Sequence, residues 1–248
     1  ARQLFDVYAT GHMTLSGFAE RQGRSTVEVV LGWPSEGPPL FVGTGSEAER
    51  VAALQLLARP DAVYVIDAMT IAEFVNLGVQ ETLDHLPKVL VSALTKTMLE
   101  GFVREAEEDR SVAASTEVEG ELALIEHDAR YHARRIEFFK ALLAAVEKYC
   151  EVQPVYGELP NEGEVPRLAE VLQDEELEVL LLAKSAGATV LTLDGRFRSV
   201  LEVVAKVPGV WPQALLMHCA SEELVDPMKL AAATIRQFLT NRSFVSLG

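Results

Sequence analysis

The chain of 248 residues has only two cysteines, Cys150 and Cys219, and neither belongs to a CxxC pair. This scarcity excludes a disulfide framework and the ligand spacing of a zinc site. No apolar run reaches the roughly 18 to 20 residues that a membrane-spanning helix needs, so we expect no membrane association. The first residues, ARQLFDVYAT, lack an initiator Met and a signal-peptide core. We therefore expect a cytoplasmic protein and a piece of a longer chain.

Positive charge is also in short supply. The chain has 22 Lys and Arg residues against 37 Asp and Glu residues, which gives a formal net charge of −15. Proteins that bind nucleic acid without selectivity are usually basic, so the total field opposes long polyanions. Any nucleic-acid role must therefore come from a local basic patch, a bridging metal or a neighbouring domain.

The composition is otherwise that of a globular protein, with 49% hydrophobic and 24% charged residues. The length fits one large domain or one domain with an appendage. Residues 1–38 show the least regular pattern, and within them Thr26 to Leu31 (TVEVVL) reads as a strand. The Gly- and Pro-rich stretch 32–39 reads as a linker. We expect residues 1–38 to be an extension or linker and residues 39–248 to form the main domain.

Short apolar strands alternate with helices along that domain. Strands are expected at Ala62 to Ile66, Lys88 to Ser92 and Ala188 to Leu193, because each is a short continuous apolar run. Helices are expected over about 47–57, 71–77, 80–85, 95–108, 174–186, 197–204, 213–220 and 226–239. Alternation of this kind predicts an α/β fold whose sheet is mainly parallel, with helices on both faces.

The middle of the chain departs from this alternation. Segments 112–116 and 121–125 flank Glu-Gly-Glu, which predicts a hairpin. His127 to Tyr149 has apolar residues at helical spacing and predicts a long amphipathic helix. A short strand over 151–155 and a loop over 157–166 follow. We interpret residues of about 110–165 as an insertion of a hairpin and a helix.

Acidic residues stand where the predicted strands end. Asp67 and Asp194 each follow a strand directly, and the carboxyl ends of parallel strands meet at one sheet edge. The helix before the last strand begins at that same edge, and its first turn contains Glu175, Glu176 and Glu178. Glu176 is therefore expected near Asp194. Glu100 lies about two turns into the helix after the second strand, farther from the edge.

Carboxylates that converge in one cleft repel each other, and a bound cation relieves the repulsion. Oxygen ligands suit Mg²⁺ or Mn²⁺, and such a metal activates water for attack on phosphorus. Taken singly, each acid has a plainer interpretation as a turn residue or helix cap. Arg196 and Arg198 follow Asp194 and are candidates for phosphate contact, or for neutralising the acids.

Three segments together resemble the PIN domain family. VYVIDAMTIAEF (63–74) is similar to its opening motif, and VLVSALTKTMLEGF (89–102) to its second. EELEVLLLAKSAGATVLTLDGRF (175–197) matches best, as an acid, an apolar helix, Gly187 and a strand ending in Thr-x-Asp. The resemblance covers residues of about 60–105 and 170–205. Val210-Trp211 and the ending 244–247 (FVSL) resemble PIN domains that end large multidomain bacterial proteins.

The resemblance implies a three-layer α/β/α fold and metal-dependent cleavage of RNA, in some members of DNA. It also implies that dimers are frequent, so a homodimer or attachment to neighbouring domains is the expected assembly. Its site residues fall on Asp67, Glu100, Glu176 and Asp194, with Glu178 as a further metal ligand. We also expect Thr192 to be a catalytic residue that helps to orient the water or an acid. The third acid is Glu where the family commonly has Asp, and Met69 replaces a small polar residue. Segment 89–102 fits the family's second motif only approximately.

The first hypothesis is thus an endoribonuclease that uses Mg²⁺ or Mn²⁺. The second is a non-catalytic PIN-like module that binds RNA or a protein, which the acidic net charge favours. A third is a haloacid-dehalogenase-like phosphatase, because 67–70 (DAMT) resembles the D-x-D-x-T motif of those enzymes. Met69 stands where such chemistry needs a general acid.

Overall fold

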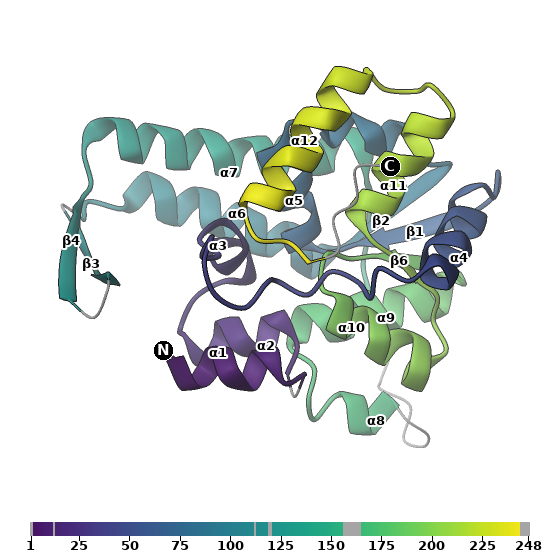
Figure 1. Ribbon diagram of the computed structural model, residues 1–248, viewed down its shortest axis with the longest axis horizontal. Helices are drawn as coiled ribbons and strands as arrows, with labels where there is room; N and C mark the ends of the chain where they lie inside the picture. Colours follow the sequence, from purple (N-terminus) through teal and green to yellow (C-terminus); the bar gives the residue numbers. More distant parts are fainter. Residues whose placement is uncertain (1, 12, 112, 119–120, 156–164, 244–248) are drawn as a thin grey trace.

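The computed structural model describes residues 2–11, 13–111, 113–118, 121–155 and 165–243 (Figure 1). Within them, five parallel strands form the central sheet in the order β5-β2-β1-β6-β7. The strands are β1 (Val63–Ile66), β2 (Lys88–Ser92), β5 (Glu151–Gln153), β6 (Thr189–Leu191) and β7 (Gly209–Val210). The parallel sheet predicted from the apolar runs is confirmed, and the expected strand over 151–155 is its edge strand.

Helices cover both faces of the sheet. They are α4 (Glu47–Leu57), α5 (Ala68–Leu77), α6 (Ala93–Glu108), α7 (Ala129–Tyr149), α8 (Val165–Leu168), α9 (Asp174–Ala186), α10 (Gly195–Val200), α11 (Pro212–Ser221) and α12 (Pro227–Leu239). A 3₁₀ helix spans Gln80–His85, and a π-helical turn, Leu201–Ala205, continues α10.

Alternate residues of each strand enter the two layers of the core. Tyr64 and Ile66 of β1 pack with α5, α7 and α11, whereas Val65 packs with α9 and α10 on the opposite face. All three side chains are fully buried. Burial on both faces explains why these strands are continuous apolar runs. The layers confirm the three-layer α/β/α architecture.

The inserted segment forms an arm. Helices α6 and α7 lie side by side, and the hairpin of β3 (Ala113–Val118) and β4 (Glu121–Glu126) connects them at the far end (Figure 1). The predicted hairpin and long helix are both confirmed. Arg135 of α7 pairs with Asp109 at the end of α6, with 2.8 Å between the charged atoms. Most of the expected loop over 157–166, like segment 244–247, lies outside the described residues.

The first part of the chain is helical and well packed. It forms α1 (Arg2–Ala9), α2 (Leu15–Arg21) and α3 (Thr26–Leu31), so the strand predicted at Thr26 to Leu31 is wrong. The reason is local, because Ser25 and Glu28 form a capping box that starts α3. An aromatic cluster joins these helices, since Phe18 lies 5.5 Å from Tyr8 and 5.5 Å from Trp33 between ring centroids.

Glycine is required where the chain passes close above the sheet edge. A Cβ on Gly195, the first residue of α10, would lie 2.7 Å from the Val42 carbonyl oxygen. The Gly195 amide donates a hydrogen bond to the Phe41 carbonyl at 2.9 Å, which holds segment 41–42 there.

No helix among the described residues is long and apolar enough to cross a membrane.

A buried ion pair ties the beginning and end of the described chain to α5. Arg242 donates to Glu73 of α5 at 2.9 Å, and both side chains are almost completely buried. The same guanidinium donates to the carbonyl of Val30 in α3 at 3.0 Å. Gln237 of α12 adds a weaker contact to Glu73 at 3.4 Å. The pair therefore fixes α3 and α12 on the same helix.

The variant Arg242→Met should lose about 3–5 kcal/mol in the free energy of unfolding, because it leaves the Glu73 charge buried and unpaired. Urea denaturation followed by circular dichroism measures this loss. The double variant Glu73→Leu/Arg242→Met should regain a large part of it, because an apolar pair needs no charge compensation. A double variant no more stable than the single one would contradict this account.

Candidate active site

Two aspartates lie side by side at the carboxyl edge of the sheet. Asp67 follows β1 and Asp194 lies just beyond β6, which pairs with β1. Both are almost completely buried, and each caps the helix that follows it. Asp67 accepts from the Thr70 amide at 2.8 Å, and Asp194 accepts from the Arg196 amide at 2.8 Å. Parallel topology thus brings together two acids that are far apart in the sequence.

The first turn of α9 adds two glutamates to the same place. Glu175 accepts hydrogen bonds from the Ala68 amide at 2.8 Å and from the Thr95 hydroxyl at 3.0 Å. Glu176 accepts from the Gln173 amide at 3.1 Å. Both glutamates are buried, with 6% and 2% of their surface exposed. We call Asp67, Glu175, Glu176 and Asp194 the carboxylate cluster.

Burial makes the charged forms of these acids unfavourable. Desolvation raises the pKa of Asp67 to about 6, and the nearby Asp194 adds to the shift. Desolvation and the charge of Asp67 raise the pKa of Glu175 to about 7. Desolvation and the charge of Asp194 raise the pKa of Glu176 to about 8. Burial also raises the pKa of Asp194, against its backbone hydrogen bonds. The acids therefore act on each other in three neighbouring pairs, Glu175 with Asp67, Asp67 with Asp194, and Asp194 with Glu176.

Hydroxyl groups surround the cluster. Thr192 lies between the two aspartates, since its Oγ1 accepts from the Asp194 amide at 3.2 Å and its side chain lowers the pKa of Asp67. The Thr70 hydroxyl also lowers the pKa of Asp67, and it accepts from the Leu193 amide at 2.7 Å. The Thr192 side chain therefore lies beside both aspartates.

Two other predicted acids lie differently. Glu100 pairs with Lys96 on the surface of α6 at 3.5 Å, and 46% of its side chain is exposed. The structure therefore does not bring Glu100 to the cluster. Glu178 lies at its margin, because it accepts from the Leu94 amide at 3.4 Å and raises the pKa of Glu175.

Sequence reasoning noted Glu175 in the first helical turn but did not assign it to the site. When the third family motif is matched to residues 175–197 at Gly187, its one acid falls on Glu176. The tandem Glu175-Glu176 at a helix start was the available signal, because neighbouring residues there turn to different sides of the cluster. The structure brings both to the sheet edge, Glu175 beside Asp67 and Glu176 beside Asp194.

The donor chemistry of the cluster fits a hard divalent cation, since it is made only of carboxylate and hydroxyl oxygens. Asp67 Oδ2 and Glu176 Oε1 are buried and have no hydrogen-bond partner, so both have capacity for a ligand. Throughout the described part of the chain, however, no group of three or more His, Cys, Asp or Glu side chains is arranged to hold a metal ion. The donors fit, and their present arrangement would have to tighten around a cation.

The two candidate arginines occupy different environments. Arg196 lies between aromatic rings, 4.7 Å from the Tyr8 ring centre and 5.1 Å from that of Phe41, and its buried Nε has no hydrogen-bond partner. Arg198 is buried, donates to the Val42 carbonyl at 2.8 Å, pairs with Glu49 and stacks on Trp211. Arg198 thus anchors segment 42–49, whereas Arg196 lines an open space.

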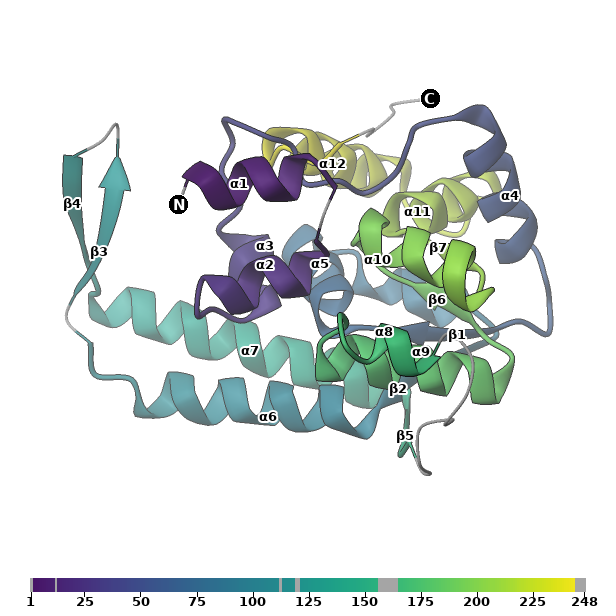
Figure 2. The ribbon, with the colours of Figure 1, turned by 90° about the horizontal axis from the view of Figure 1, so that it is seen from below.

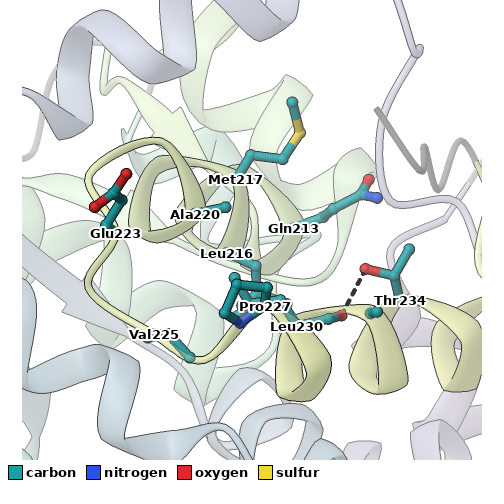
Figure 3. A pocket seen from close by; sticks show the side chains of 10 residues that line it. Gln213, Leu216, Met217, Ala220, Glu223, Val225, Pro227, Leu230 and Thr234 are labelled. Atoms are coloured by element: carbon teal, nitrogen blue, oxygen red, sulfur yellow. Dashed lines mark hydrogen bonds between the residues drawn. The ribbon is translucent and has the colours of Figure 1, made fainter.

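Two hollows border the cluster on opposite sides of α2. The first, of about 730 Å³, is lined by Arg196, Arg21 and Phe41, and we call it the Arg196 hollow. The second, of about 330 Å³, is lined by Arg24, Ser16 and Glu175, and we call it the Arg24 hollow. A third hollow, of about 660 Å³, lies between α11 and α12 and is mostly apolar (Figure 3). It shares no residue with the cluster.

Stability in the absence of divalent metal should fall as pH rises from about 4 to about 8. Across this window the folded protein binds more protons at Asp67, Glu175 and Glu176 than the unfolded chain does, because their folded pKa values are raised. Glu175→Gln should therefore flatten the profile and gain on the order of 2 kcal/mol at pH 8. Urea denaturation in EDTA measures the free energy of unfolding at each pH. Glu137→Gln, at an exposed position of α7, is the control. A steady rise in stability over the window would contradict the raised pKa values.

Comparison with known protein families shows which family the chain belongs to. The sequence model of the PIN domain associated with the TPR-GreAB-C-PIN system matches residues 65–202, which include all four acids of the cluster. No curated protein and no solved structure matches the chain. PIN domains are in general nucleases that use divalent metals. The match covers more than half of the chain, and the chain therefore belongs to the PIN domain family associated with the TPR-GreAB-C-PIN system.

Proposed function

We propose that this PIN domain is a metal-dependent endoribonuclease that hydrolyses phosphodiester bonds. The observation that carries the proposal is the convergence of Asp67, Glu175, Glu176 and Asp194 at one sheet edge, with oxygens of Asp67 and Glu176 left unpartnered. Four buried carboxylates are unfavourable unless protons or a cation compensate their charge. Oxygen-only ligands favour Mg²⁺ or Mn²⁺.

The four acids would hold the metal, with Glu178 at the margin. When bound, the cation would lower the pKa of water and stabilise the charge that develops on phosphorus. Asp67 and Asp194 are fixed by backbone amides, so their carboxylates are oriented before any ligand arrives. Thr192, in contact with both aspartates, would hold their relative orientation.

Arg196 is the proposed contact for a substrate phosphate. It lies two residues after Asp194, lines the Arg196 hollow and has an unpartnered buried Nε. A guanidinium can donate two parallel hydrogen bonds to a phosphate. Arg198 was predicted for the same task, but its donors contact Val42 and Glu49, so we assign substrate contact to Arg196. A local cation of this kind meets the requirement set by the net charge of −15.

A non-catalytic module that binds RNA or a protein is the second candidate function. The surface position of Glu100 favours it, because the acid of the family's second motif pairs with Lys96 and stays outside the cluster. The two candidates differ in whether the carboxylate cluster supports turnover. Release of phosphate from a small monoester would instead indicate the phosphatase.

The variants Asp67→Asn and Asp194→Asn should each lower Mn²⁺-dependent cleavage at least about 100-fold, because each removes a charged ligand from the proposed metal. Glu100→Gln is the matched control and should stay within about threefold of the original chain, since Glu100 is half-exposed. Cleavage of 5′-labelled single-stranded RNA, with EDTA blanks, measures the rates. Thermal melts verify that every variant is folded.

Full metal-dependent cleavage by Asp67→Asn would overturn the assignment of the site. Absence of cleavage by the original chain, together with a melting temperature that Mn²⁺ does not change, would favour the non-catalytic module.

A further inference from the structure

The beginning of α2 closes the carboxylate cluster. The Leu15 amide donates to Asp194 Oδ2 at 2.5 Å, although the two residues are 179 positions apart. Thr14 and Ser16, on either side of Leu15, both lower the pKa of Glu176. Residues 14 to 16 of the N-terminal segment therefore lie beside acids of the PIN core, and the Leu15 amide occupies an oxygen of Asp194.

Helix α2 also separates the two hollows. Met13, Thr14 and Gly17 line the Arg196 hollow, whereas Ser16 and Ala19 line the Arg24 hollow. Asp67, Glu176 and Asp194 line neither hollow, and Glu175 lines only the second. Glu20 of α2 and Gln173, which are hydrogen-bonded to each other, line both hollows, so α2 and this contact separate the two open spaces.

Helices α1 and α2 are held to the PIN core by polar contacts and by the side chains of Tyr8, Leu15 and Phe18, which are buried in the core shared with β1 and α5. The Tyr8 hydroxyl accepts from the Phe41 amide at 3.1 Å, and Arg196 donates to the Ala9 carbonyl at 3.2 Å. Gln173 donates to Glu20 at 3.0 Å. Most of the aromatic packing of α1 and α2 is with each other and with Trp33.

By contrast, α3 is firmly attached to the core. It packs along α5, and the buried Arg242 holds the Val30 carbonyl. Between α2 and α3 the chain turns at Gly23, whose φ of +65° suits glycine and whose missing side chain leaves open space. The turn at residues 22–24 therefore connects α1 and α2 to α3, which Arg242 fixes on the core (Figure 2).

We propose that α1 and α2 form a flap that closes the carboxylate cluster, and that a substrate reaches the cluster only when this flap lifts from the Gly23 turn. Lifting the flap frees Asp194 Oδ2 and joins the Arg196 and Arg24 hollows into one groove across the four acids. Arg196 then lines one end of the groove and Arg24 the other, and two guanidiniums in one groove suit a strand with successive phosphates. This inference rests on the proposed nuclease function for its substrate, whereas the motion itself is independent of that function.

Leu15 offers a test that removes the one amide contact. Leu15 is the first residue of α2, where proline is tolerated, and Thr14 has the extended conformation (φ −74°, ψ 168°) that proline requires of the preceding residue. Leu15→Pro deletes the donor to Asp194, and Leu15→Ala is the matched control that keeps the amide while shortening the buried side chain. The difference between the two variants isolates the hydrogen bond.

Hydrogen–deuterium exchange of the full chain, followed by mass spectrometry, measures how readily α1 and α2 open. Peptides of α1 and α2 should exchange at least about tenfold faster than those of α3 and α5, and faster again in Leu15→Pro than in Leu15→Ala. If α1 and α2 exchange at the same rate as α5, the flap proposal is wrong. The segment would then open only when the whole domain unfolds.

A covalent lock tests the consequence for the substrate. Glu20→Cys and Gln173→Cys, in a Cys150→Ser background, place a thiol on each side of an existing contact. A short bismaleimide that joins them should lower RNA cleavage at least about tenfold relative to the same protein capped with N-ethylmaleimide. Equal cleavage by locked and capped protein would overturn the proposal. If neither protein cleaves RNA, the nuclease function fails, while the exchange data still decide whether the flap exists.

Discussion

The burial of four carboxylates at one sheet edge is the constraint on which this structure depends. Each acid would be strongly unfavourable in isolation, because removing a carboxylate from water costs several kcal/mol unless it is compensated. The fold compensates with backbone amides at the beginnings of helices. Asp67 and Asp194 cap α5 and α10, and Glu175 accepts from the Ala68 amide in the first turn of α5. The positive ends of these helix dipoles converge on the acids.

The same amides explain why the raised pKa values coexist with a stable fold. Amide donors favour the charged form of each acid, whereas burial and the neighbouring acids oppose it, and the second effect prevails at Asp67, Glu175 and Glu176. The site therefore holds its acids in place while leaving their charge incompletely compensated. A cation that binds to such a site would meet carboxylates already oriented by backbone amides, although the four acids would have to draw closer around it.

Periodicity and strand ends predicted the part of the site that follows from topology. Asp67 and Asp194 were found because an acid directly after a buried strand has only one sheet edge to occupy. Glu176 was found because α9 begins where β6 ends. Glu175 was missed because the family motif assigns one acid to this helix start, and that acid was matched to Glu176. The local sequence does not tell which of two adjacent glutamates turns toward Asp67. Glu100 was expected from the second motif, but it faces solvent beside Lys96.

Residues 26–31 were predicted wrongly for a different reason, which concerns where α1 and α2 lie. TVEVVL has the composition of a strand, but the capping box of Ser25 and Glu28 favours a helix, and the sheet ends at β7 on one side and β5 on the other. Because α3 is a helix docked on α5, the preceding α2 lies beside the acids. The family match begins at residue 65, so this covering segment lies outside the part of the chain that defines the family. The four acids of the cluster and the helices that lie over them thus belong to separate parts of the sequence, and under the proposed flap access to the cluster changes without any change in the acids themselves.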